Sequence, residues 1–161
     1  MSEAWDRVQE HVREVNLLAG AAATLHWDQQ TYMPTGAGGL RGEQLAALSK
    51  VLHQKQTSSA YGDLLHAAHD AATEPTQKVA TAKLLEDYER TTKLSEDLVG
   101  RIAKAESDGF AAWMKAKEDG DYAVFKPALQ TLLDLSKEKA NALDPDGHPL
   151  QVLMESFDPG V

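Results

Sequence analysis

The stretch LHWDQQTYMPTGAGGLRGEQLAAL, residues 25–48, contains the sharpest break in a sequence whose apolar pattern is otherwise helical. Pro34 disfavours a helical conformation for the residue before it, and the glycine-rich run behind it favours a turn. The stretch therefore predicts that one helix ends near residue 30 and that a second helix begins near residue 40.

Asp28 lies near the C-terminal end of the first of these helices, where the helix dipole repels an anion by about 0.3–1 kcal/mol. The second helix begins among glycines, which cost about 1 kcal/mol each relative to alanine inside a helix. Residues that are this unfavourable for local helix stability usually have a tertiary contact or belong to a functional site. We interpret Asp28 as part of a structural lock with Arg41 or with the backbone amides of residues 36–41. A direct catalytic role for Asp28 is the less favoured interpretation.

The remaining sequence predicts an all-α protein, built as a bundle of antiparallel helical hairpins. Apolar residues recur at alternating steps of three and four from Trp5 to Ala22, which is typical of a helix with one buried face. No strand-like alternation is present. The expected helices cover residues 3–30, residues 40–55, a stretch from Ser58 or Ser59 to a stop before Pro75, two helices between Pro75 and Pro127, and residues 127–143.

Residues at the helix ends support these boundaries. Ser95 offers an N-cap where the two helices between the prolines meet, and Gly120 offers a left-handed stop for the second of them. Asp121 can cap the next helical turn, and Pro127 fits the first turn of the last long helix, where its missing amide costs nothing. After this helix, proline and glycine surround one short apolar run.

Composition places the chain among ordinary globular domains. Its 161 residues, 42% of them hydrophobic, suit a single domain over residues 1–161. The net charge of −9 disfavours a nucleic-acid partner, and the absence of cysteine excludes disulfides and thiolate metal sites. The first residues, MSEAWDRVQEH, lack the apolar core of a signal peptide, and no apolar run approaches the ~18 residues of a membrane span. We therefore expect a cytoplasmic protein without membrane partners.

His66 and His69 are the only histidines spaced one helical turn apart, and Asp70 stands beside them. Such a pair is the usual start of a helix-borne zinc site. The motif contains no glutamate, and no third ligand is identified, so ordinary solvated side chains are the favoured interpretation. The sequence contains no Glu-x-x-His and no Gly-x-Ser-x-Gly, which leaves neither di-iron nor serine-hydrolase chemistry supported.

Residues 25–55 resemble the N-terminal signature of the thermostable (Taq-type) metallocarboxypeptidases. In that family Trp-Asp-Gln-x-Thr-x-Met-Pro is followed by Gly and then by Arg-x-x-Gln-Leu. Residues 88–99, 111–143 and 148–160 also resemble family segments, in the same order, so the likeness runs along the whole chain. The signature positions are Trp27, Asp28, Gln29, Thr31, Met33, Pro34, Gly36, Arg41, Gln44 and Leu45.

The resemblance implies a fragment or a shortened relative of a metal-dependent carboxypeptidase. Family members are much longer, and their zinc or cobalt site is His-Glu-x-x-His with a later glutamate, which does not occur in this sequence. Hydrolysis by zinc needs imidazoles fixed on one face and a carboxylate to activate water. We therefore expect no catalytic residue and no cofactor in this chain, which would correspond to the helical part that walls the substrate cleft.

The chain is expected to have a protein partner. Helices shaped to pack against an absent domain leave an apolar face, so we expect a homodimer or an association with the catalytic remainder of a longer polypeptide. A stand-alone, non-catalytic helical module for dimerisation or protein binding is the alternative function.

Overall fold

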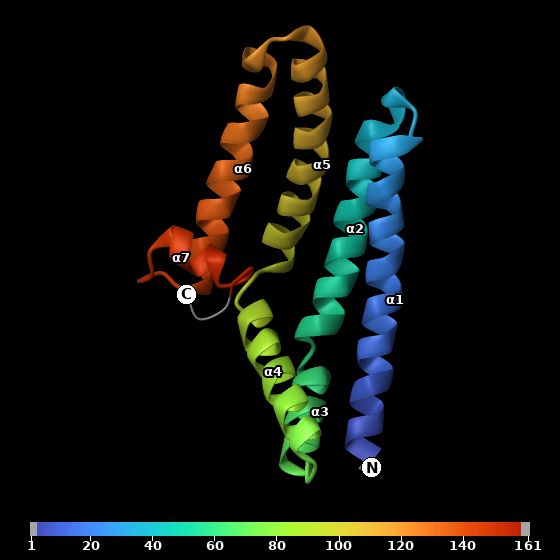
Figure 1. The fold of residues 1–161 in the computed structure, drawn as a ribbon, viewed down its shortest axis with the longest axis vertical. Helices are drawn as coiled ribbons and strands as arrows, with labels where there is room; N and C mark the ends of the chain where they lie inside the picture. Colours follow the sequence, from blue (N-terminus) through green and yellow to red (C-terminus); the bar gives the residue numbers. More distant parts are fainter. Residues whose placement is uncertain (1–2, 159–161) are drawn as a thin grey trace.

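The computed structural model describes residues 3–158, and every regular element within this range is helical. The expectation of an all-α fold is confirmed. The elements are α1 (Glu3–Thr31), the short 3-10 helix η1 (Thr35–Ala37), α2 (Gly38–Thr57), α3 (Ser59–Asp70), α4 (Pro75–Thr92), α5 (Glu96–Asp119), α6 (Tyr122–Leu143) and α7 (Pro149–Met154) (Figure 1). None of these helices is both long enough and apolar enough to cross a membrane.

The chain runs up and down the long axis of the molecule in antiparallel legs, two of which are broken (Figure 1). α1 is one unbroken leg of about 43 Å. α2 and α3 return along it, α4 and α5 run back again, and α6 descends. Contacts between helices follow this order, because α2 packs on α1 and α5, α6 packs on α5 and α7, and α3 packs on α1 and α4.

Local capping explains where the legs break and turn. The Ser58 hydroxyl accepts a hydrogen bond from the Tyr61 amide at 3.3 Å, and the Ser95 hydroxyl accepts one from the Leu98 amide at 3.2 Å. Each bond satisfies an amide that the first turn of a helix leaves unpaired. Gly120 ends α5 in the left-handed conformation, with φ of 66°. These helix ends were expected from the sequence.

The expected start of α6 was wrong. The helix begins at Tyr122, because the Asp121 carboxylate accepts a hydrogen bond from the Ala123 amide and caps it five residues earlier than predicted. Pro127 therefore lies inside the helix. Proline has no amide to donate to the carbonyl oxygen of Ala123, and its ring lies against the same turn. Only this one helical hydrogen bond is lost, in a turn that the Asp121 cap already holds. The boundaries of α2 also extend beyond the expected residues 40–55 at both ends.

Among residues 3–158, buried apolar side chains form two clusters, and others such as Leu45 and Leu98 are buried outside them. The larger lies between α1, α3 and α4 and includes Val8 and Leu65, both fully buried. The smaller joins α6 to α7 through Leu143 and Val152. The molecule exposes 10165 Å², whereas a compact monomer of its mass exposes about 7,900 Å². An elongated arrangement of helices accounts for the difference, because it leaves many faces uncovered.

Gly62 allows α3 and α4 to approach closely. A Cβ atom added there would lie 2.6 Å from the Tyr88 ring, which is too close for any real contact. We expect Gly62→Ala to lower the free energy of unfolding by about 1–2 kcal/mol, measured by urea denaturation. The matched control is Gly20→Ala in α1, where an added Cβ meets nothing within 4 Å. This change should stabilise the protein by about 0.5–1 kcal/mol, so effects of the same sign would contradict the prediction.

The α5–α6 hairpin carries a surface ion cluster that should respond to acid. Arg101 donates hydrogen bonds to Glu138 across the hairpin and to Asp97 on its own helix. The hydrogen bond from Arg101 holds the pKa of the Glu138 carboxyl below its ordinary value. A carboxyl whose pKa is lowered by folding stabilises the protein at neutral pH, and this contribution is lost as the pH falls through the lowered pKa.

We therefore expect wild type to be more stable than Glu138→Gln at pH 7, with the difference shrinking as the pH falls toward about 3. Urea midpoints of both proteins across this range measure the effect. A difference that stays constant with pH would show that Glu138 acts through packing rather than through its charge.

Candidate functional site

The corner between α1 and α2, residues 25–45, carries all ten positions of the sequence signature. α1 ends where the amides of Tyr32 and Met33 both donate to the Asp28 carbonyl oxygen, at 3.0 and 2.9 Å. Pro34 then adopts an extended conformation, with ψ of 139°, and turns the chain. The 3-10 helix η1 and α2 come directly after it, so α2 runs back alongside α1.

Arg41 holds this corner together. Its Nη2 atom donates to Asp28 Oδ2 at 2.6 Å, and its Nη1 atom donates to the Leu25 carbonyl oxygen at 2.6 Å. Its Nε atom donates to Gln44 Oε1 at 3.1 Å. The Arg41 side chain is only 13% exposed, and that of Asp28 is 35% exposed. Of the two partners that the sequence predicted for Asp28, the structure shows Arg41, which places a cation beside an anion that the helix end disfavours.

A third helix joins the corner through Gln29. Its amide nitrogen donates to the Ser107 hydroxyl of α5 at 2.8 Å and to the Ser107 carbonyl oxygen at 3.3 Å. Ser107 is almost fully buried, and a Cβ atom added at Gly42 of α2 would lie 3.5 Å from its hydroxyl oxygen. Gln29 therefore links the corner to a residue 78 positions away. Sequence reasoning named Gln29 in the signature but missed this contact, since no local pattern pairs it with Ser107.

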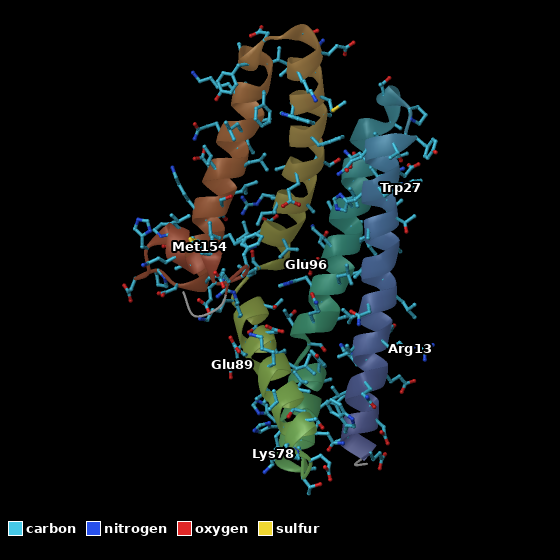
Figure 2. The ribbon with its side chains drawn as sticks, in the orientation of Figure 1. Arg13, Trp27, Lys78, Glu89, Glu96 and Met154 are labelled. Atoms are coloured by element: carbon cyan, nitrogen blue, oxygen red, sulfur yellow. The ribbon has the colours of Figure 1, made fainter. Side chains whose placement is uncertain are left out.

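The other signature residues divide between packing and exposure. Leu45 is buried, Met33 is half-buried, and the Thr31 hydroxyl donates to the Trp27 carbonyl oxygen at 2.8 Å. Trp27, which is labelled in Figure 2, is 57% exposed. Its ring lies 5.4 Å from that of Tyr32, which is 76% exposed. Nothing in the structure explains Gly36, whose position leaves open space around an added side chain.

His66 and His69 do not come together as a metal site. His66 is exposed, whereas the Nδ1 atom of His69 lies 2.9 Å from the hydroxyl of Thr81, a fully buried residue of α4. His69 therefore takes part in the packing of α3 on α4. Within residues 3–158 no three His, Cys, Asp or Glu side chains are grouped closely enough to bind a metal ion. The described residues do not fit the zinc or cobalt site expected for the longer enzymes.

Groups with shifted pKa values are scattered rather than gathered at one place. A hydrogen bond from Lys55 lowers the pKa of Glu14, and burial raises the pKa of Tyr61 in the core between α1, α3 and α4. Lys104 and Asp108 pair along α5, where the hydrogen bond raises the pKa of Lys104. Such ion pairs are typical of protein surfaces.

None of these shifted groups belongs to the corner between α1 and α2. That corner is a structural junction that displays two aromatic rings.

Comparison with known proteins identifies the family. Residues 7–161 match the model of the Carboxypeptidase Taq (M32) metallopeptidase family. The chain belongs to the M32 carboxypeptidase family. It is 30% identical over 171 aligned positions to thermostable carboxypeptidase 1 of Thermus thermophilus, covering 98% of this chain and 34% of that protein.

Solved structures agree with this M32 assignment. The crystal structure of BsuCP matches with a TM-score of 0.91 and 26% identity, covering 99% of this chain and 33% of that one. The M32 carboxypeptidase of Deinococcus radiodurans R1 matches with a TM-score of 0.76 and 29% identity, covering 99% of this chain and 32% of that one. The chain thus spans about a third of the length of the relatives that it matches.

Proposed function

We propose that this chain supplies the helical part that walls the substrate cleft of an M32-type carboxypeptidase, and that it is not catalytic by itself. The observation that carries the proposal is the match along nearly the whole chain to about a third of each relative. The His-Glu-x-x-His motif of the resembled enzymes does not occur in the 161 residues. In this role the Asp28–Arg41 corner keeps two helices of the wall in register.

The mass of the native polypeptide tests this proposal most directly. An antibody raised against the chain would be used to detect the protein in cell lysate, under denaturing conditions for the polypeptide mass and under native conditions for any complex. We expect a band corresponding to a polypeptide much larger than the 17.5 kDa chain, or a complex with a separate polypeptide that carries the catalytic motif. A band at the mass of this chain, with no such associated polypeptide under native conditions, would contradict it.

The purified chain should not release amino acids from peptides. Activating water for hydrolysis requires a metal held by several ligands, and the described residues offer no such group. A peptide with a free C-terminus would be incubated with the chain, with and without added zinc or cobalt, and the release of its terminal amino acid followed. Metal-dependent release that co-purifies with the chain and disappears in a variant with His66→Ala and His69→Ala would overturn this prediction.

The second candidate function is a stand-alone helical module that dimerises or binds another protein. Exposed apolar residues favour it, because Tyr32 and Phe157 are 76% and 90% exposed and large apolar side chains of this kind are common in interfaces. Light scattering measures the outcome. A homodimer at micromolar concentration would support this candidate, and a 17.5 kDa particle at every workable concentration would count against it. The cytoplasmic location stays a prediction, which cell fractionation would check.

A further inference from the structure

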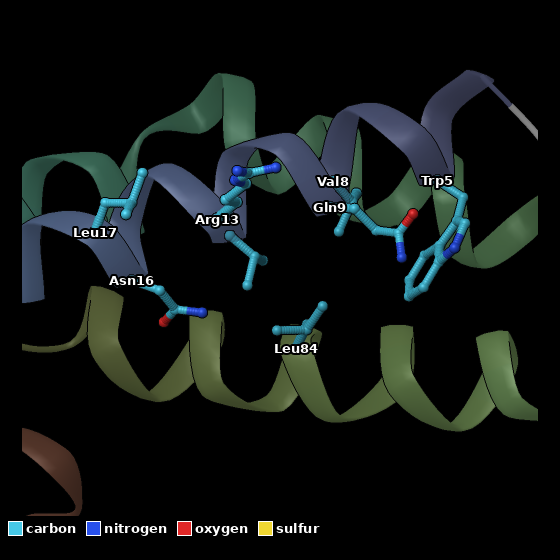
Figure 3. Close-up of a pocket in the computed structure, with 8 residues that line it drawn as sticks. Trp5, Val8, Gln9, Arg13, Asn16, Leu17 and Leu84 are labelled. Carbon is cyan, nitrogen blue, oxygen red and sulfur yellow. The ribbon is translucent and has the colours of Figure 1, made fainter. Parts of the chain in front are cut away.

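A groove runs between α1 and α4, and all the residues that line it belong to these two helices. Both helices pack against α3, which lies behind them. The groove has a volume of about 470 Å³, and Figure 3 shows Trp5 and Gln9 pointing from α1 into it while Leu84 points toward them from α4. Along α1 it extends from Trp5 to Leu17, which is about 18 Å of helix axis or three turns.

The lining of the groove is apolar at the base and polar along one edge. Gln9, Arg13 and Asn16 are spaced at steps of four and three, so they share one edge of α1. Within residues 3–158 none of these three side chains has a hydrogen-bond or ion-pair partner. The apolar residues of the groove are Trp5, Val8, Val12, Leu17 and Leu84.

We propose that this groove binds an amphipathic helix supplied by the part of an M32 polypeptide that lies outside the matched third, with an acidic side chain placed toward Arg13. The proposal rests on the proposed function. α1, α3 and α4 surround one buried cluster on three sides, and a fourth helix would close the fourth side as in a four-helix bundle. Three turns of groove fit the spacing of apolar anchors by which helices dock into grooves.

The length of the relatives and the exposed surface favour this occupant. The matched region makes up 33% of the BsuCP chain, so the larger part of such a polypeptide lies outside it and is available to cover the groove. The chain exposes 10165 Å², well above the compact value of about 7,900 Å². A second copy is the poorer occupant. A symmetric contact places the same surface against itself, and two concave grooves do not fill each other.

Two synthetic peptides of about 18 residues test the groove. Both carry leucines at helical spacing on one face, and they differ only in having glutamates or lysines along the edge of that face. Each is titrated into the isotope-labelled 161-residue chain, and binding is measured by calorimetry and by amide chemical shifts. We expect the glutamate peptide to bind about threefold to fivefold more tightly than the lysine peptide, with shifts centred on α1 and α4.

Variants locate the interaction. Leu17→Asp changes an exposed side chain of the groove, so it should weaken binding of the glutamate peptide about tenfold without unfolding the protein. Arg13→Glu should reverse the preference between the two peptides. Arg7→Glu is the matched control, because Arg7 is an exposed arginine of α1 outside the groove lining. It should leave the preference unchanged.

Several results would overturn the proposal. These are failure of both peptides to bind, chemical shifts centred elsewhere, or an unchanged preference in Arg13→Glu. Self-association of the chain that Leu17→Asp abolishes would assign the groove to a second copy instead. Failure here is distinguishable from failure of the proposed function, because the native polypeptide mass and peptide hydrolysis are measured without reference to the groove.

Discussion

Leu65→Ala is expected to lower the free energy of unfolding by about 2–5 kcal/mol. Leu65 lies in α3 and is fully buried against Val8 and Tyr61. Removing its side chain deletes buried apolar surface and leaves a cavity between α1 and α3. The cluster around Leu65 has only four buried members, so few neighbouring contacts compensate. Urea denaturation followed by circular dichroism measures the loss.

The control for this prediction is Leu40→Ala. Leu40 is 62% exposed at the start of α2, so the same chemical change there should alter stability by less than about 0.5 kcal/mol. Equal effects at the two positions would show that the cluster around Leu65 does not act as a core. A local loss confined to α3 and α4, seen by hydrogen exchange, would show instead that the two clusters unfold separately.

Arg41→Ala is expected to destabilise the protein by about 1–3 kcal/mol. The change leaves the Asp28 carboxylate without its cation and the Leu25 carbonyl oxygen without its donor. Asp28 is partly exposed, so water screens part of the loss and keeps it below the cost of a fully buried pair. The stability of the variant is measured in the same urea experiment.

A double-mutant cycle separates the ion pair from the other contacts of Arg41. If the two side chains act together, Asp28→Ala and Arg41→Ala combined should cost less than the sum of the single changes. Arg41→Lys keeps the charge but not the planar fork that reaches three acceptors, so it should fall between wild type and Arg41→Ala. Strict additivity of Asp28→Ala and Arg41→Ala would mean that the structural lock does not exist.

Most helix ends could be predicted because their causes are local. Ser58, Ser95, Gly120 and Asp121 each satisfy backbone groups within a few residues of themselves, so their roles are visible in the sequence. The start of α6 was predicted wrongly at Pro127, because two local signals competed there. Proline fits the first turn of a helix, but the cap at Asp121 starts the helix earlier, and one lost bond near the end is tolerated.

The candidate site could be predicted only in part. The amino-acid sequence by itself determined the helical hairpins and the turn at Pro34. It also limited the partner of Asp28 to Arg41 or the amides of residues 36–41, since one turn brings these close residues together. Tertiary structure alone decided that Gln29 reaches Ser107, that Gly62 admits the Tyr88 ring and that α1 and α4 leave a groove between them. These features depend on which helix faces pack together. Helical periodicity shows that a face is apolar, but the choice of its partner depends on the shapes and distances of side chains that are far apart in sequence.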